Sequence, residues 1–164
     1  MLNRKRFFLY NLLLIVLVTV PFYPPSAELT LKGHWLSSLE GNWRGEAVHT
    51  PVGPTPYNIN FIRVDPDCVS GTAYTGFSNH TWTFCPAEDG VILNFLSDFR
   101  GNDDPIVLRP IHSEQGKTVF KSAKIAFMDV ILEHADSHFK IDIMHYDKLH
   151  VRIELRPAHA VSTY

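Results

Sequence analysis

Residues 139–156 read Phe-Lys-Ile-Asp-Ile-Met-His-Tyr-Asp-Lys-Leu-His-Val-Arg-Ile-Glu-Leu-Arg, and this stretch decides the fold class. Apolar residues occupy every second position from Phe139 to Ile143, and the alternation resumes from Leu149 to Leu155 after a polar turn. A period of two is that of a strand with one buried face, and two such runs joined by a short turn are typical of an antiparallel hairpin. The stretch therefore predicts a hairpin whose apolar face lies against a core.

The same pattern extends over residues 41–157, with turn signals rich in Gly, Pro, Asp or Asn between the runs. Connections this short exclude the long crossovers of a parallel sheet. We predict an all-β fold, an antiparallel up-and-down barrel of eight to ten strands, because closure removes the unpaired edges of a sheet; a sandwich is the alternative. The candidate strands are residues 41–50, 57–65, 68–75, 80–85, 91–97, 106–112, 118–121, 125–133, 139–146 and 149–156, and residues 29–39 are the candidate for a short helix.

The chain begins with a segment typical of export. Three cations at positions 4–6 precede an apolar run over residues 7–23, and prolines and small residues follow it. These features predict a signal peptide over residues 1–27, with an uncleaved anchor as the alternative and as the one predicted contact with a membrane. We expect a secreted or periplasmic protein that continues with a lead-in over 28–40, the barrel over 41–157 and a tail over 158–164.

The charge of the chain is unevenly distributed. Lys plus Arg total 15 against 17 Asp plus Glu, which gives a net charge of −2. Three of the cations lie within residues 1–27, so the rest of the chain carries 12 cations against 17 anions, a net charge of −5. Nucleic acids and anionic lipids are bound by clustered cations, so we predict no nucleic-acid partner.

Cys68 and Cys85 are the two cysteines of the chain. In an exported domain an even pair predicts a disulfide, with a redox or metal-ligating pair as the alternative. If the two residues face each other in one hairpin, the numbers of facing residues add up to 153 and the turn is centred on Gly76 and Phe77, where glycine can adopt a positive φ. We expect the bridge to contribute about 3 kcal/mol through the loop that it closes.

The first predicted strand opens with Leu39-Glu-Gly41-Asn-Trp43-Arg-Gly45. Gly-x-Trp at this place, followed by a meander and a late arginine, resembles the calycin superfamily, which includes lipocalins and nitrobindin-like barrels. The resemblance implies that Trp43 plugs one end of the barrel and that Arg156 packs across its ring, with Arg152 as the second choice. A guanidinium is attracted to the face of an indole, so both residues would be structural.

Aromatic residues suited to lining a cavity are spread over the predicted strands. A small barrel can hold one small ligand in its interior, and His145 shares its parity with the apolar face of its strand. We therefore expect a small apolar or amphipathic ligand, bound by aromatic burial and by a few polar groups. The candidate ligand-binding residues are Tyr57, Phe61, Tyr74, Trp82, Phe95, Phe127, Phe139 and His145, and Phe84 is a further aromatic residue able to line a cavity.

Two other functions stay open at this point. An inward-facing His145 would suit a haem-binding or enzymatic barrel, and the loops at 50–56 and 100–105 would suit a surface interaction module over a packed core. Imidazoles and carboxylates also gather in the turn at 133–138, but two His beside a hairpin turn are more often exposed than metal-bound. We predict no metal, no cofactor and no enzymatic activity, because the sequence holds no nucleophile elbow, phosphate-binding loop or zinc-protease helix.

Overall fold

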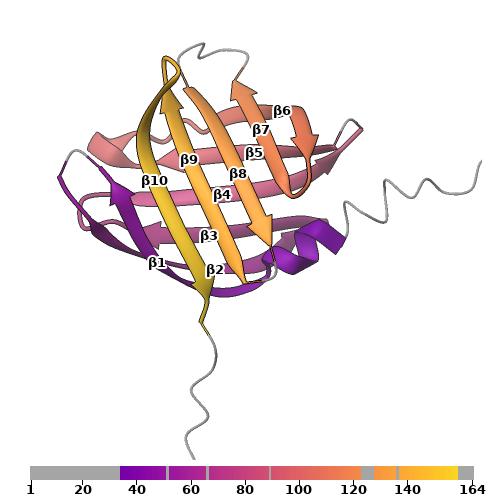
Figure 1. The fold of residues 1–164 in the computed structure, drawn as a ribbon, viewed down its shortest axis with the longest axis horizontal. Helices are drawn as coiled ribbons and strands as arrows, with labels where there is room; N and C mark the ends of the chain where they lie inside the picture. Colours follow the sequence, from indigo (N-terminus) through magenta and orange to yellow (C-terminus); the bar gives the residue numbers. More distant parts are fainter. Residues whose placement is uncertain are drawn as a thin grey trace, which may run out of the picture.

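Ten antiparallel strands close into a barrel in the computed structural model (Figure 1). The structure describes residues 34–50, 52–65, 67–88, 90–122, 128–135 and 137–158, so the predicted signal peptide and the end of the predicted tail lie outside the described residues. In these ranges, none of the helical segments is both long enough and apolar enough to cross a membrane. The elements are β1 (Gly41–His49), β2 (Thr55–Asp65), β3 (Cys68–Tyr74), β4 (Asn79–Ala87), β5 (Gly90–Ser97), the 3-10 turn η1 (Phe99–Gly101), β6 (Ile106–Glu114), β7 (Lys117–Ser122), β8 (Met128–Ala135), β9 (His138–His145) and β10 (Lys148–Pro157).

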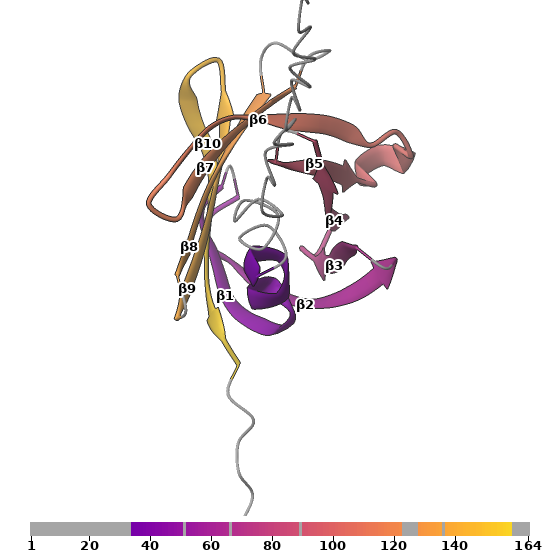
Figure 2. The same cartoon turned by 90° about the vertical axis from the view of Figure 1, so that its right-hand side faces the viewer.

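Each strand pairs with its neighbours in sequence, and β1 pairs with β10 to complete the ring. Figure 2 shows β7 to β10 as one wall of the barrel and β3 to β5 as the wall that faces it. The predicted all-β, up-and-down antiparallel barrel is confirmed, with the largest of the expected numbers of strands. The alternating pattern explains the barrel, because every second side chain of a strand points to the shared interior.

The β3–β4 hairpin has the predicted register. Val69 faces Phe84 and Tyr74 faces Asn79, so the numbers of facing residues add up to 153. Gly76 in the turn has a φ of 90°, which favours glycine. Cys68 and Cys85 form the predicted disulfide, with their Cα atoms 4.3 Å apart, and a disulfide is consistent with an extracytoplasmic location.

One end of the barrel, called here the Trp43 end, is covered by a short helix over residues 34–39, inside the segment predicted to be helical. Leu36 and Leu39 of this helix are buried, and the indole Nε1 of Trp43 donates a hydrogen bond to the carbonyl oxygen of Leu39 at 2.7 Å. The Trp35 ring lies edge-on to Phe84, with 5.5 Å between the ring centroids. Trp43 is therefore buried at this end of the barrel, and its polar atom is satisfied by the helix end.

The expected contact between Arg156 and the ring of Trp43 is wrong. In the pairing of β1 with β10, Trp43 faces Pro157 and Arg44 faces Arg156. Trp43 is buried whereas Arg156 is exposed, because neighbouring residues of a strand point to opposite faces. Arg156 therefore lies on the outer surface of the barrel. Arg152, the second choice, donates hydrogen bonds from Nε and Nη2 to the carboxylate of Asp142 at 2.7 and 2.8 Å. Its guanidinium is therefore not the partner of the Trp43 ring either.

Gly45 lies at the seam where β1 and β10 close the ring. A Cβ atom at this position would stand 1.8 Å from the carbonyl oxygen of Glu154, so no other residue fits without moving the two strands apart. The glycine that follows the Gly-x-Trp motif is therefore required by the closure of the barrel.

Candidate functional site

The structure divides the predicted ligand-binding residues into two interior groups and an outer remainder. At the Trp43 end, Phe61, Phe84 and Phe139 lie together in the core. The centroid of the Phe61 ring is 5.9 Å from that of Phe84 and 5.9 Å from that of Phe139. At the other end of the barrel, which we call the His80 end, Tyr57, Trp82, Phe95 and His80 lie together. The first group packs with the rings of Trp43 and His134 and belongs to the hydrophobic core. The second group combines aromatic rings with a continuous chain of hydrogen bonds.

Two predicted site residues do not line the interior. Tyr74 is 67% exposed and lies on the outer surface, because the inward positions of β3 belong to Val69, Gly71 and Ala73. His145 has the parity of Ile143, but the strand ends there, and the imidazole is exposed beside the ring of Tyr146. Phe127 lies outside the described residues.

A chain of hydrogen bonds connects three side chains at the His80 end. The indole Nε1 of Trp82 donates to the hydroxyl oxygen of Tyr57 at 2.8 Å, and that hydroxyl lies 3.3 Å from Nδ1 of His80. Tyr57 and Trp82 are fully buried and His80 is half-buried. The chain therefore runs from the middle of the core to a residue that solvent reaches.

The donors and acceptors of this chain fix the tautomer of His80. An indole nitrogen can only donate, so the Tyr57 oxygen accepts from Trp82 and keeps its own hydrogen for another acceptor. A buried hydroxyl hydrogen requires such a partner, and the acceptor beside it in the described part of the chain is Nδ1 of His80. The neutral His80 imidazole then carries its hydrogen on Nε2. That N–H has no protein partner among the described residues and is available to a ligand.

Burial keeps the groups of this site neutral. Desolvation raises the pKa of the Tyr57 phenol well above its usual range, and the hydrogen bond from Trp82 offsets this only in part. Desolvation also lowers the pKa of His80, against the opposing effect of the nearby Asp98 carboxylate. Near pH 7 the site is therefore an uncharged donor and acceptor set, not an ionised acid–base pair.

Asp98 holds the start of β4, and with it His80, in place. Its two carboxylate oxygens accept hydrogen bonds from the backbone N–H and the side-chain amide of Asn79, both at 2.6 Å. These bonds lower the pKa of Asp98. Because Asn79 precedes His80 in the strand, the clamp fixes the backbone from which the imidazole projects.

Three apolar side chains at the His80 end are buried but not completely enclosed. Phe95, Met128 and Ile143 are 6–8% exposed, whereas the side chains in the middle of the barrel, such as Trp82 and Leu93, are fully buried. Each of the three lies near the strand terminus that opens to this end of the ring. Phe95 is in ring contact with both Trp82, at 4.3 Å, and His80, at 5.5 Å between centroids. The apolar ring of Phe95 therefore adjoins the His80 imidazole.

A concave region lies on the outside, at the Trp43 end. It is a groove of about 630 Å³ between the β6–β7 and β8–β9 turns, with His112, Lys117 and Glu133 among its lining residues. The groove includes the turn at 133–138 that sequence reasoning considered for metal binding. Over the described residues, no group of three or more His, Cys, Asp or Glu side chains is arranged to hold a metal ion.

Sequence reasoning missed His80 and Asp98. His80 has the same parity as Trp82 and Phe84 in a strand of alternating residues, and this was the available signal for an inward imidazole. Asp98 follows a strand in what reads as a polar turn, and no pattern links it to Asn79, 19 positions away.

We found no protein-family model, curated protein or solved structure that matches this chain.

Proposed function

We propose that this protein is an exported, calycin-like binding barrel that takes a small amphipathic molecule at its His80 end. The observation that carries the proposal is the hydrogen-bonded chain Trp82–Tyr57–His80 beside the ring of Phe95. The inferred Nε2–H of His80 has no partner within the part of the protein that the structure describes. Export is supported by the disulfide and by the signal peptide predicted over residues 1–27.

The chemistry of the site suggests which ligand it favours. An apolar body would cover the slightly exposed side chains of Phe95, Met128 and Ile143. A single acceptor atom, such as a hydroxyl or carbonyl oxygen, would accept the hydrogen of His80 Nε2. A neutral acceptor is favoured over a carboxylate, because the lowered pKa of His80 opposes formation of an imidazolium partner.

We assign binding and not catalysis to this site. The raised pKa of Tyr57 keeps its hydroxyl protonated, and the lowered pKa of His80 removes the proton that a general acid would deliver. The groups are suited to orienting a ligand. A haem-binding or enzymatic barrel would require an inward-facing His145, and this residue is exposed at the rim.

Displacement of a fluorescent dye tests the proposal. The purified protein is loaded with anilinonaphthalene sulfonate, which is then displaced by 1-decanol or by decane, a pair that differs by one hydroxyl. We expect 1-decanol to bind more tightly than decane, and the advantage to fall about tenfold in His80→Ala, which corresponds to the loss of one hydrogen bond.

His145→Ala is the matched control, because it removes an exposed imidazole at the same end of the barrel. It should leave the preference for 1-decanol unchanged. Failure of both molecules to displace the dye would refute the binding function, and an equal loss in the two variants would refute the role of His80.

A further inference from the structure

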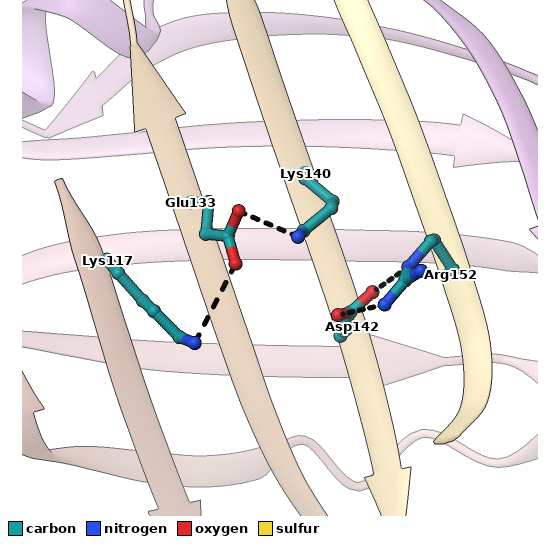
Figure 3. A network of polar contacts seen from close by, with 5 residues as sticks. All are labelled: Lys117, Glu133, Lys140, Asp142 and Arg152. Carbon is teal, nitrogen blue, oxygen red and sulfur yellow. Dashed lines mark hydrogen bonds and ion pairs between the residues drawn. The ribbon is translucent and has the colours of Figure 1, made fainter.

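The outer surface of the barrel has two contrasting faces. On β7 to β10 the outward side chains form ion pairs across the strands: Lys140 and Lys117 lie 2.7 and 3.8 Å from Glu133, and Arg152 binds Asp142 (Figure 3). On β2 to β5 the outward positions hold no charged residue over two complete rows. We call these eight residues the uncharged face: Asn60, Thr72, Thr81 and Leu96 in one row, and Ile62, Ser70, Thr83 and Asn94 in the next.

Charged residues border the two rows on each side. Asp65 faces Cys68 in the row beyond Ile62 and Ser70, and Asp98 binds Asn79 in the row beyond Thr72 and Thr81. Surfaces designed for solubility hold roughly 25–35% charged residues, so about two or three would be expected among the eight positions of the uncharged face. The composition of this face therefore distinguishes it from an ordinary solvated surface.

Hydroxyl groups on this face are held in fixed pairs. Ser70 Oγ lies 2.8 Å from Thr83 Oγ1, and Thr72 Oγ1 lies 2.9 Å from Thr81 Oγ1, each across the β3–β4 pairing. A pair of hydroxyls uses one of its two hydrogens for the mutual bond, so each pair still offers one donor hydrogen and free lone pairs. The side-chain amides of Asn60 and Asn94 add donors and acceptors at the ends of the rows.

We propose that the uncharged face binds a neutral polysaccharide chain. A row of neutral groups that both donate and accept matches the hydroxyl groups of a glycan, while Ile62 and Leu96 can contact the C–H faces of the sugar rings. The face is the convex outside of a barrel, so it suits an extended chain that crosses several strands and not a small molecule, which needs a concave site. This inference is independent of the function proposed for the His80 end.

Other occupants fit this face less well. Phosphate-bearing and acidic ligands require Lys or Arg, which the face lacks. Protein interfaces depend on anchors such as Trp, Tyr and Arg, whereas six of the eight residues here are Ser, Thr or Asn. The composition thus favours a glycan over a protein partner or a second copy of the chain.

Affinity electrophoresis tests this proposal. The full chain is run in native gels that contain galactomannan, hydroxyethyl cellulose or amylopectin, and in one that contains the acidic polysaccharide alginate. We expect retardation by at least one neutral polysaccharide and none by alginate. Thr72→Glu/Thr83→Glu should abolish the retardation, and Thr72→Ala/Thr83→Ala, which adds no charge, should weaken binding about tenfold.

Lys121→Glu is the matched control, because it changes the net charge by the same amount as the double glutamate variant but lies on the charged face. It should bind as the parent does, and circular dichroism should show that all variants are folded. The proposal fails if no neutral polysaccharide retards the protein, if alginate retards it equally, or if the double glutamate variant still binds. It also fails if sedimentation shows a dimer that this variant splits, since the occupant is then a second copy.

Discussion

Tyr57→Phe removes one oxygen atom from the centre of the candidate site. The substitution leaves the fully buried Trp82 Nε1–H and the half-buried His80 Nδ1 without their common partner. A buried polar group that loses its hydrogen bond costs about 1–3 kcal/mol, and the indole should contribute most of the loss because solvent does not reach it. We expect the free energy of unfolding to fall by about 2–4 kcal/mol.

Urea denaturation, followed by circular dichroism, measures this loss, with Tyr74→Phe as the control. Tyr74 loses the same atom, but it is 67% exposed, and its hydroxyl donates to the carbonyl oxygen of Gly76 in contact with water. We expect the control to change stability by less than about 0.5 kcal/mol. At about 4 °C per kcal/mol for a domain of this size, the two melting temperatures should differ by about 8–16 °C.

Equal stabilities of the two variants would refute a stabilising role for the hydrogen bonds that join Trp82, Tyr57 and His80. That result would mean that water or a rearranged side chain replaces the Tyr57 hydroxyl as the hydrogen-bond partner of Trp82 Nε1 and His80 Nδ1. The hydrogen bonds through Tyr57 would then not hold the His80 imidazole in place. A loss confined to Tyr57→Phe would support both the geometry and the assignment of the His80 tautomer.

Three further predictions concern the seam, the site and the outer wall. Gly45→Ala should destabilise the barrel by more than about 3 kcal/mol or prevent folding, because its Cβ would clash with the Glu154 carbonyl; urea denaturation would show this. Since the pKa of His80 is lowered on folding, the unfolded chain takes up the proton first as the pH falls below about 6.5. Stability should therefore decrease there by at most about 1.4 kcal/mol per pH unit, and His80→Gln should remove this part of the slope in melting curves. Arg152→Met should cost about 3 kcal/mol by leaving the buried Asp142 carboxylate unpaired, and adding Asp142→Asn should recover part of that loss.

Most of the fold could be predicted, because antiparallel hairpins are local. Turn residues and alternation defined ten strands, and the two cysteines fixed one register, which the pairing of Val69 with Phe84 confirms. Arg156 shows where a family resemblance misled. Its alternation with Leu155 already places it on the polar face of the last strand, and that physical signal was the correct one.

The site was predicted less well, because hydrophobicity is a weak guide where a strand has small inward residues. In β3 the inward positions include Gly71, where a Cβ would lie 2.8 Å from side-chain atoms of Ile59 and Phe61. The neighbouring strand fills that space, so the large Tyr74 of β3 points outward although its size suggests the core. The inward His80 was missed for the converse reason, since a polar residue in an alternating pattern is read as exposed.

The closed ring also has a consequence for folding kinetics. Nine of its ten pairings join consecutive strands, but the tenth joins Trp43 to Pro157, 114 positions apart. Bringing the ends of so long a segment together costs about 2 kcal/mol more chain entropy than closing a ten-residue loop. The β1–β10 pairing should therefore form after the hairpins, late in folding. Substitutions along it then accelerate unfolding and leave the refolding rate nearly unchanged, so this pairing sets how long the native state persists.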